Sequence, residues 1–77
     1  MLIKVKYFAG LKQRLGRGEE VVELADGMNV SNLWKQIAGD AAIPEDVMTA
    51  INMEYVQKDA VISDGDEVAF FPPVTGG

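Results

Sequence analysis

The chain has 77 residues and a mass of 8.4 kDa, which leaves room for one domain and excludes a second hydrophobic core. It contains no cysteine and no histidine, so disulfides, thiol nucleophiles, imidazole bases and the usual zinc ligand sets are excluded, and we expect no metal site. Seven basic and twelve acidic residues give a net charge of −5, which disfavours nucleic-acid binding.

The charges are unevenly distributed along the chain. The first seventeen residues contain no acid and carry five bases: Lys4, Lys6, Lys12, Arg14 and Arg17. This basic stretch is either a solvated surface or a docking surface for a partner, and composition leaves both open. No segment approaches the ~20 apolar residues of a membrane span, and the start lacks a signal-peptide pattern, so we expect a cytoplasmic protein without a membrane partner.

The N-terminal segment alternates between two faces. From residue 2 to residue 8, one face is apolar and the other carries lysines, a period of two that is typical of a strand. The inward-facing set is Ile3, Val5 and Tyr7. Residues 9–15 are good helix formers and are followed by Gly16, so one or two helical turns are expected there.

A second strand and the clearest helix follow. Residues 19–24 place Val22 and Leu24 on one face, which predicts a strand. The helix begins after Asn29, whose side chain can accept a backbone N–H of the first turn, and it ends at Gly39. Its apolar side chains recur with helical spacing and form one stripe: Val30, Leu33, Trp34, Ile37 and Ala38.

The last third of the chain predicts a hairpin and a final strand. Residues 49–53 and 54–56 form the hairpin around Asn52. Its next position is Met53, where a tight turn favours glycine, so either the turn is of another type or Met53 carries ~1–2 kcal/mol of strain. The acidic run 64–67 is a turn signal rather than a calcium loop, and the last strand spans residues 67–71.

This order of elements predicts the fold. Strand, strand, helix and three strands, with a helical interruption after the first, favour an α+β domain in which one main helix packs across a mixed sheet. The last strand can return beside the first, which is the β-grasp, or ubiquitin-like, architecture. We assign residues 1–71 to this domain and expect residues 72–77 to form an extended, flexible tail.

The tail carries the strongest functional signal. Pro72 and Pro73 cannot continue a strand and favour a stiff extended segment that points away from the sheet. Gly76 and Gly77 have no Cβ, so they could thread a narrow channel and deliver the α-carboxylate of Gly77. A second enzyme could activate this carboxylate with ATP, after which a sulfur nucleophile would give a thiocarboxylate and a lysine an amide. A frayed glycine terminus is the alternative.

The chain resembles the family of molybdopterin synthase small subunits, which are β-grasp sulfur carriers. The resemblance covers nearly the whole length and is carried by residues 3–9 and, more specifically, by residues 64–77, which include Phe-Phe-Pro-Pro-Val-Thr-Gly-Gly. Carriers of the thiamin type also end in Gly-Gly but typically lack the Phe-Pro-Pro-Val-Thr run. Met53 departs from the glycine that is common in the family's hairpin.

The resemblance implies a mechanism. An activating enzyme similar to the ubiquitin-activating type would use ATP to adenylate Gly77, and sulfuration would then give a C-terminal thiocarboxylate. The tail would insert into the large synthase subunit and donate sulfur to a cyclic pterin precursor, building the dithiolene that binds molybdenum. The chain itself would bind no cofactor, the large subunit would supply the catalytic basic residues, and two small and two large subunits would assemble.

Strand parity predicts one exposed aromatic patch. Phe8 lies opposite the inward face of the first strand and Phe71 opposite that of the last, so pairing these strands would bring both rings together beside the tail. The resemblance places partner contacts at Phe8 and Phe71 and also at Tyr55 and Lys12. Contacts are expected along the tail as well, at Pro72, Pro73, Val74 and Thr75. Packing at the core edge is the alternative for Phe8 and Tyr55.

Other functions stay open on the same residues. The tail also suits a protein modifier that forms amide bonds with lysines, and the thiamin-type carrier is a related possibility. A non-covalent adaptor that uses only the patch of Phe8 and Phe71 is a third.

Overall fold

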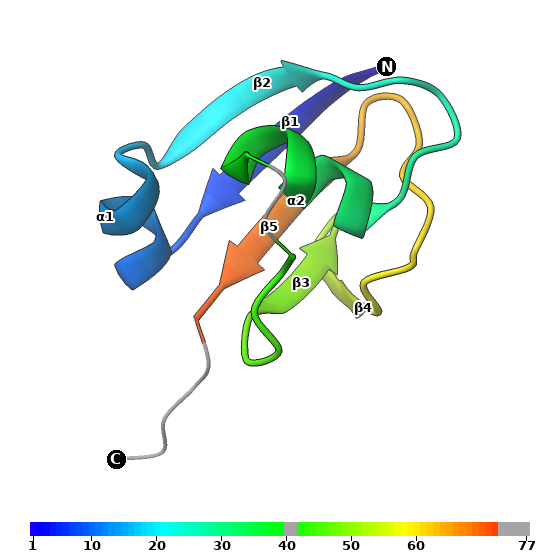
Figure 1. Cartoon of the computed structure of the whole chain (residues 1–77). Coiled ribbons are helices and arrows are strands. Elements are labelled where there is room, and N and C mark those ends of the chain that lie inside the picture. The colour runs from blue at the N-terminus through cyan, green and yellow to red at the C-terminus, as the bar shows by residue number, and fades with distance from the viewer. Residues whose placement is uncertain (40–41, 73–77) are drawn as a thin grey trace.

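Five strands and two short helices follow one another along the described chain in the order that the sequence predicts. The computed structural model describes residues 1–39 and 42–72, apart from the side chain of Arg14. The elements are β1 (Leu2–Tyr7), α1 (Gly10–Leu15), β2 (Glu19–Glu23), α2 (Val30–Ala38), β3 (Met48–Ile51), β4 (Glu54–Val56) and β5 (Glu67–Phe71) (Figure 1).

The strands form one mixed sheet in the order β2-β1-β5-β3-β4. The last strand, β5, lies at the centre, parallel to β1 and antiparallel to β3, and the outer pairs are antiparallel. Figure 1 shows α2 crossing one face of this sheet. The predicted β-grasp architecture, with the last strand beside the first, is confirmed.

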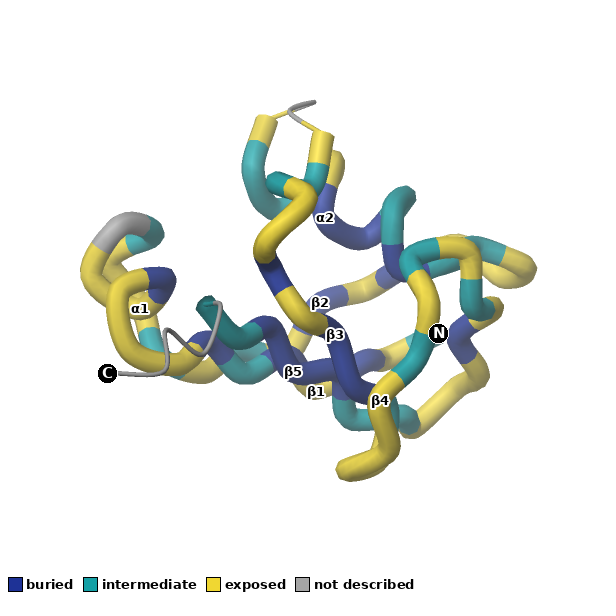
Figure 2. Tube along the Cα trace, turned by 90° about the horizontal axis from the view of Figure 1, so that it is seen from below, coloured by how far each residue is buried: buried dark blue, intermediate teal, exposed yellow. Residues whose placement is uncertain are grey.

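The core lies between α2 and the central strands, where Figure 2 shows buried segments of the helix and of β5 and β3. On β1 the inward set is buried as predicted, with Ile3 and Val5 fully enclosed. Trp34 of α2 is 3% exposed and meets Phe70 of β5 edge-on, with ring centroids 5.0 Å apart. The helix therefore docks on β5, the strand that leads into the tail.

Both ends of α2 have the predicted caps. The side chain of Asn29 accepts a hydrogen bond from the backbone N–H of Asn32 at 2.8 Å, and the side chain of Asn32 accepts one from the backbone N–H of Asn29 at 3.0 Å. At the other end Gly39 has a φ of 71°, the left-handed conformation that glycine adopts without steric cost. Local sequence signals thus set the helix bounds, and its apolar stripe sets its orientation.

The hairpin of β3 and β4 settles the question raised by Met53. Asn52 and Met53 have φ values of 50° and 70°, so both central residues of the turn are left-handed, as a tight hairpin requires. The turn is therefore of the expected kind, and Met53 bears the strain. The amide of Asn52 bonds the Asp66 carboxylate and the Glu67 backbone, which ties the turn to the start of β5.

The acidic turn before β5 is held by its own side chains. The Asp64 carboxylate accepts from the backbone N–H of Leu2, and the Asp66 carboxylate accepts from the backbone N–H of Ser63, each at 2.8 Å. These acids stabilise a solvated turn, as predicted. In the part of the chain that is described, no three acidic side chains are grouped so that they could hold a metal ion.

The division into a domain of residues 1–71 and a tail of residues 72–77 stays a prediction, since residues 73–77 lie outside the described residues. Within residues 1–39 and 42–72, no helix has the length and apolar character needed to cross a membrane.

Candidate functional site: an aromatic cluster at the end of the central strand

Phe8 and Phe71 stack on each other at the end of the central strands. The two strands are parallel and pair Tyr7 with Phe70, and the backbone N–H of Phe8 donates to the Phe70 carbonyl at 3.1 Å, so the pairing runs one residue further. The ring centroids lie 4.8 Å apart with 9° between the planes. Phe8 is 41% exposed and Phe71 is half-buried, so the stack stays open to a partner.

Tyr55 adds a third ring from the edge of the sheet. It lies on β4 and meets Phe71 edge-on, with centroids 6.1 Å apart and planes at 60°. Pairing in register places Tyr55 opposite Ala50 and Ala50 opposite Ala69, so all three lie on the sheet face away from α2. Phe8, Tyr55 and Phe71 are called the aromatic cluster below.

Ion pairs occupy most of the basic stretch at the N-terminus. They are Lys4–Glu19, Lys6–Glu67 and Arg17–Glu20, with N···O distances of 3.5, 3.5 and 2.6 Å. Lys12 makes none of the ion pairs found among the described residues, and its aliphatic stem lies against Gly18, where an added Cβ would approach Lys12 Cε to 2.9 Å. Four of these bases have described side chains, and Lys12 is the one among them without an ion pair, while the three paired bases belong to a solvated surface.

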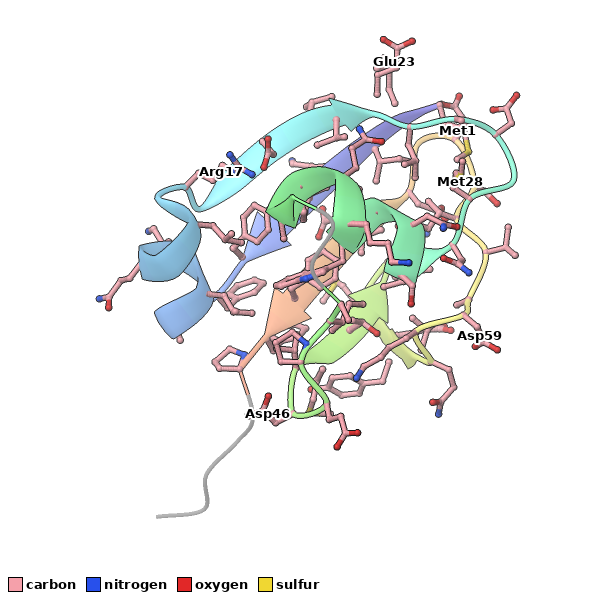
Figure 3. The ribbon with its side chains drawn as sticks, in the orientation of Figure 1. Met1, Arg17, Glu23, Met28, Asp46 and Asp59 are labelled. Carbon is pink, nitrogen blue, oxygen red and sulfur yellow. The ribbon has the colours of Figure 1, made fainter. Side chains whose placement is uncertain are left out.

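A polar network joins β1, β2 and α2 through Arg17, which lies in the loop between α1 and β2. The Tyr7 hydroxyl donates to Glu20 Oε2 at 2.7 Å, and Arg17 donates to the carbonyl of Ile37, near the end of α2, at 3.0 Å. Figure 3 shows Arg17 at the junction of α1 and β2. Burial, together with the hydrogen bond to Glu20, raises the pKa of Tyr7 well above its ordinary value. The network therefore ties the loop between α1 and β2 to the end of α2.

Sequence reasoning missed this network. Tyr7 was predicted to face inward, which is correct since it is 2% exposed, but alternation along a strand says nothing about the partner of its hydroxyl. The pair Arg17 and Glu20, at a spacing of three residues, was the available signal.

The structure brings only some of the predicted site residues together. Phe8, Tyr55 and Phe71 form the cluster, Pro72 follows it half-buried, and Lys12 lies apart on α1. Their roles in partner binding stay predictions. The other predicted residues lie outside the described residues: Pro73, Val74, Thr75, Gly76 and Gly77.

A five-stranded mixed sheet crossed by one helix, with an aromatic cluster where its central strand ends, defines a ubiquitin-like β-grasp protein. Residues 5–77 match the model of the ThiS family. The molybdopterin synthase sulfur carrier subunit of Chlamydomonas reinhardtii is 41% identical to the chain and is matched over 100% of both proteins. The chain belongs to the ThiS family, and this relative confirms the predicted resemblance to molybdopterin synthase small subunits.

Solved structures agree with this assignment. The putative molybdopterin converting factor, subunit 1, of Pyrococcus furiosus is 36% identical, with a TM-score of 0.81 over 96% of this chain and 99% of that one. SAMP1 of Haloferax volcanii has a TM-score of 0.86 over 100% of both chains at 24% identity, which shows that it shares the fold.

Proposed function

We propose that the chain is the sulfur carrier subunit of a molybdopterin synthase and that it carries the sulfur on Gly77. The observation that supports this most is the match to the sulfur carrier subunit of Chlamydomonas reinhardtii over the whole of both chains. The exposed aromatic cluster immediately before Pro72 supports a partner that binds the domain and the following segment together.

The chemistry needs no catalytic side chain on this protein. An adenylating enzyme of the ubiquitin-activating type joins the Gly77 carboxylate to the AMP moiety of ATP and releases pyrophosphate. Hydrosulfide then attacks the acyl carbon, the bond to the adenylate oxygen breaks, AMP leaves with the electron pair, and loss of the proton on sulfur gives the thiocarboxylate. ATP is bound by the activating enzyme and no cofactor by this chain. The absence of cysteine means that no thiol of the carrier competes for the acyl group.

Sulfur transfer would take place on the large subunit of the synthase. The aromatic cluster docks there, Lys12 contacts an acidic group at the rim, and residues 72–77 enter the active site. The large subunit supplies the basic residues that move protons while the thiocarboxylate donates sulfur to the cyclic pterin precursor. Two small and two large subunits form the assembly, and we propose a cytoplasmic location, which cell fractionation tests.

The decisive experiment is the intact mass of the carrier after co-expression with its adenylating enzyme and a sulfur source. The expected result is the mass increase for replacement of one carboxylate oxygen by sulfur, located at Gly77 by C-terminal fragmentation. A matched variant that lacks Gly77 folds normally and shows no increase. An unchanged mass in the full-length chain, with adenylating enzyme shown to be active on a known carrier, would refute the proposal.

The same samples test the other functions. Gly-Gly remnants on lysines after proteolysis would identify a protein modifier, and co-purification with a thiazole-forming enzyme would identify a thiamin-type carrier. If removal of both glycines left cellular molybdenum-enzyme activity unchanged, the chain would be a non-covalent adaptor.

A further inference from the structure

A groove of about 740 Å³ opens where β3 and β4 diverge, at the edge of the sheet that β4 forms. Its lining is apolar at Val47, Met48, Tyr55 and Val56 and acidic at Glu45 and Asp59. Figure 3 shows Asp59 in the loop that follows β4. Of the aromatic cluster, Tyr55 lines the groove, whereas Phe8 and Phe71 do not.

Hydrogen bonds hold both walls of the groove in place. Thr49 Oγ1 donates to the Val56 carbonyl at 2.9 Å, where the two strands are still paired. Beyond that point, Ser31 Oγ donates to the carbonyl of Lys58 at 3.0 Å, which anchors one wall to the start of α2. The ammonium of Lys58 donates to the Pro44 carbonyl at 3.2 Å and so links one wall to the other. A ligand therefore finds a groove that is already formed.

The charges in the groove are unbalanced. Among the described residues that line it, Lys58 is the one base, and its ammonium group donates to the Pro44 carbonyl. Among the described residues, neither Glu45 nor Asp59 has a basic group within ion-pair distance. Both carboxylates are exposed, so a cation that enters the groove can pair with them without displacing a partner within the chain.

The lining matches one kind of side chain. A valine and methionine surface suits an aliphatic stem, the exposed ring of Tyr55 suits a flat cation stacked on its face, and two carboxylates suit a group with several N–H donors. Guanidinium combines these properties, whereas an ammonium group is a strongly hydrated point charge that does not stack. We propose that the groove binds an arginine side chain of the protein that docks on the aromatic cluster.

Continuity with the cluster supports a partner protein as the source of this arginine. Tyr55 lines the groove and also meets Phe71 edge-on, and Met48 of the groove is paired with Phe71 in the β3–β5 register. A surface that covers the cluster therefore extends over the mouth of the groove. The choice of partner rests on the proposed function, but the preference for arginine does not.

The preference for arginine is tested on the isolated chain by amide chemical shifts during titration with N-acetyl-arginine amide. The expected result is saturable shifts at Val56, Gln57 and Asp59, which are lost in the double variant Glu45→Gln/Asp59→Asn. The matched control is Glu54→Gln, which removes one carboxylate of the same hairpin outside the groove lining and should keep the shifts. Equal shifts with N-acetyl-lysine amide, or shifts that survive in the double variant, would overturn the assignment.

The partner is tested by the affinity for the large synthase subunit of the same organism at low and high salt. The double variant should bind about tenfold more weakly at low salt and show a smaller salt dependence, while Glu54→Gln changes affinity less than about twofold. If the double variant and the control lost the same affinity for the large subunit, the net charge of the chain alone would explain the effect. If the wild type formed a dimer that the double variant did not form, the groove would bind a second copy of this chain. Either result would overturn the proposal.

The two proposals fail separately. If the wild-type chain does not bind the large subunit at all, the proposed function is refuted, while the titration with N-acetyl-arginine amide still decides the ligand of the groove. If the wild type and the double variant bind the large subunit equally, the groove has no role in docking and the proposed function stands.

Discussion

The ring of Phe8 stacks on the ring of Phe71 with a centroid distance of 4.8 Å, although the two residues come from opposite ends of the chain. Parallel pairing of β1 and β5 ends both strands at the same edge of the sheet, which makes the contact possible. The backbone of Phe71 is thus held by pairing with Met48 of β3, and its ring is held by the stack with Phe8. The start of residues 72–77 is fixed to the most buried strand of the sheet.

Replacing Phe71 by alanine should weaken binding to the large subunit by at least about tenfold, because hot-spot aromatics at the centre of an interface contribute most to affinity. Isothermal titration calorimetry measures the change. The matched control is Val21→Ala, which removes an exposed apolar side chain from the same sheet at its far edge and should leave affinity unchanged. Equal losses in both variants would contradict a localised docking surface.

The stack itself predicts coupling between its two rings. In a double-mutant cycle of Phe8→Leu and Phe71→Leu, we expect a coupling free energy of unfolding of about 0.5–1.5 kcal/mol, the usual range for aromatic pairs. Denaturant unfolding of the four proteins measures it. Strict additivity would mean that the rings touch without stabilising each other.

Lys12 should contribute to the rate of association more than to the lifetime of the complex. Its side chain is exposed and forms no ion pair with an acidic side chain of the described residues. Lys12→Gln should therefore lower the association rate and the salt dependence of that rate. Stopped-flow mixing with the large subunit measures both quantities. Lys35→Gln, an equal charge loss on α2, is the control, and a similar effect of the two substitutions would exclude a specific role for Lys12.

Met53→Gly should stabilise the domain by about 1 kcal/mol, because glycine adopts a φ of 70° without the clash of a Cβ. The side chain of Met53 is 91% exposed, so its loss removes little packing. Urea unfolding measures the gain. Asn52→Gly relieves a similar φ but removes the bonds to Asp66 and Glu67, so it should not stabilise, and equal gains would contradict the role given to Asn52.

Tyr7→Phe should cost about 1 kcal/mol at neutral pH through loss of the hydrogen bond to Glu20. Folding raises the Tyr7 pKa, so above the ordinary phenol value of about 10 the folded state holds a proton that the unfolded state releases. The raised pKa therefore adds its full stabilisation to the free energy of unfolding below that pH, and this stabilisation is lost as the pH rises further.

Denaturant unfolding between about pH 8 and pH 11 therefore distinguishes the wild type from Tyr7→Phe. The free energy of unfolding of the wild type should fall more steeply with pH than that of Tyr7→Phe. Tyr55→Phe, which leaves the Tyr7 network intact, should keep the steeper fall. Parallel profiles for the wild type and Tyr7→Phe would contradict the raised pKa.

Much of the fold could be predicted because it depends on local periodicity. Alternation placed Ile3 and Val5 inward, and the apolar stripe placed Trp34 against the sheet. Ala9 could not be predicted in the same way. Its φ of 51° is set by the turn from β1 into α1, and nothing in an alanine signals a left-handed backbone.

The candidate site likewise has a part that the sequence could predict and a part that it could not. Parity alone brought Phe8 and Phe71 to one face, since it needs only the pairing of two strands. The edge-on contact of Tyr55 and the groove beside it depend on how far β3 and β4 diverge beyond the pair of Thr49 and Val56, which is a distance and not a pattern. The Tyr7 hydroxyl likewise meets Glu20 only once the register of β1 and β2 is known.

The central place of β5 has a mechanical consequence. It pairs with β1 along one side and with β3 along the other, so a pull on the C-terminus acts along the strand and across both rows of hydrogen bonds. Loaded in shear, these bonds must break together, whereas those of an edge hairpin pulled apart at its ends would open one after another. The domain should therefore resist being unravelled from its C-terminal end, because both rows of hydrogen bonds must break at once.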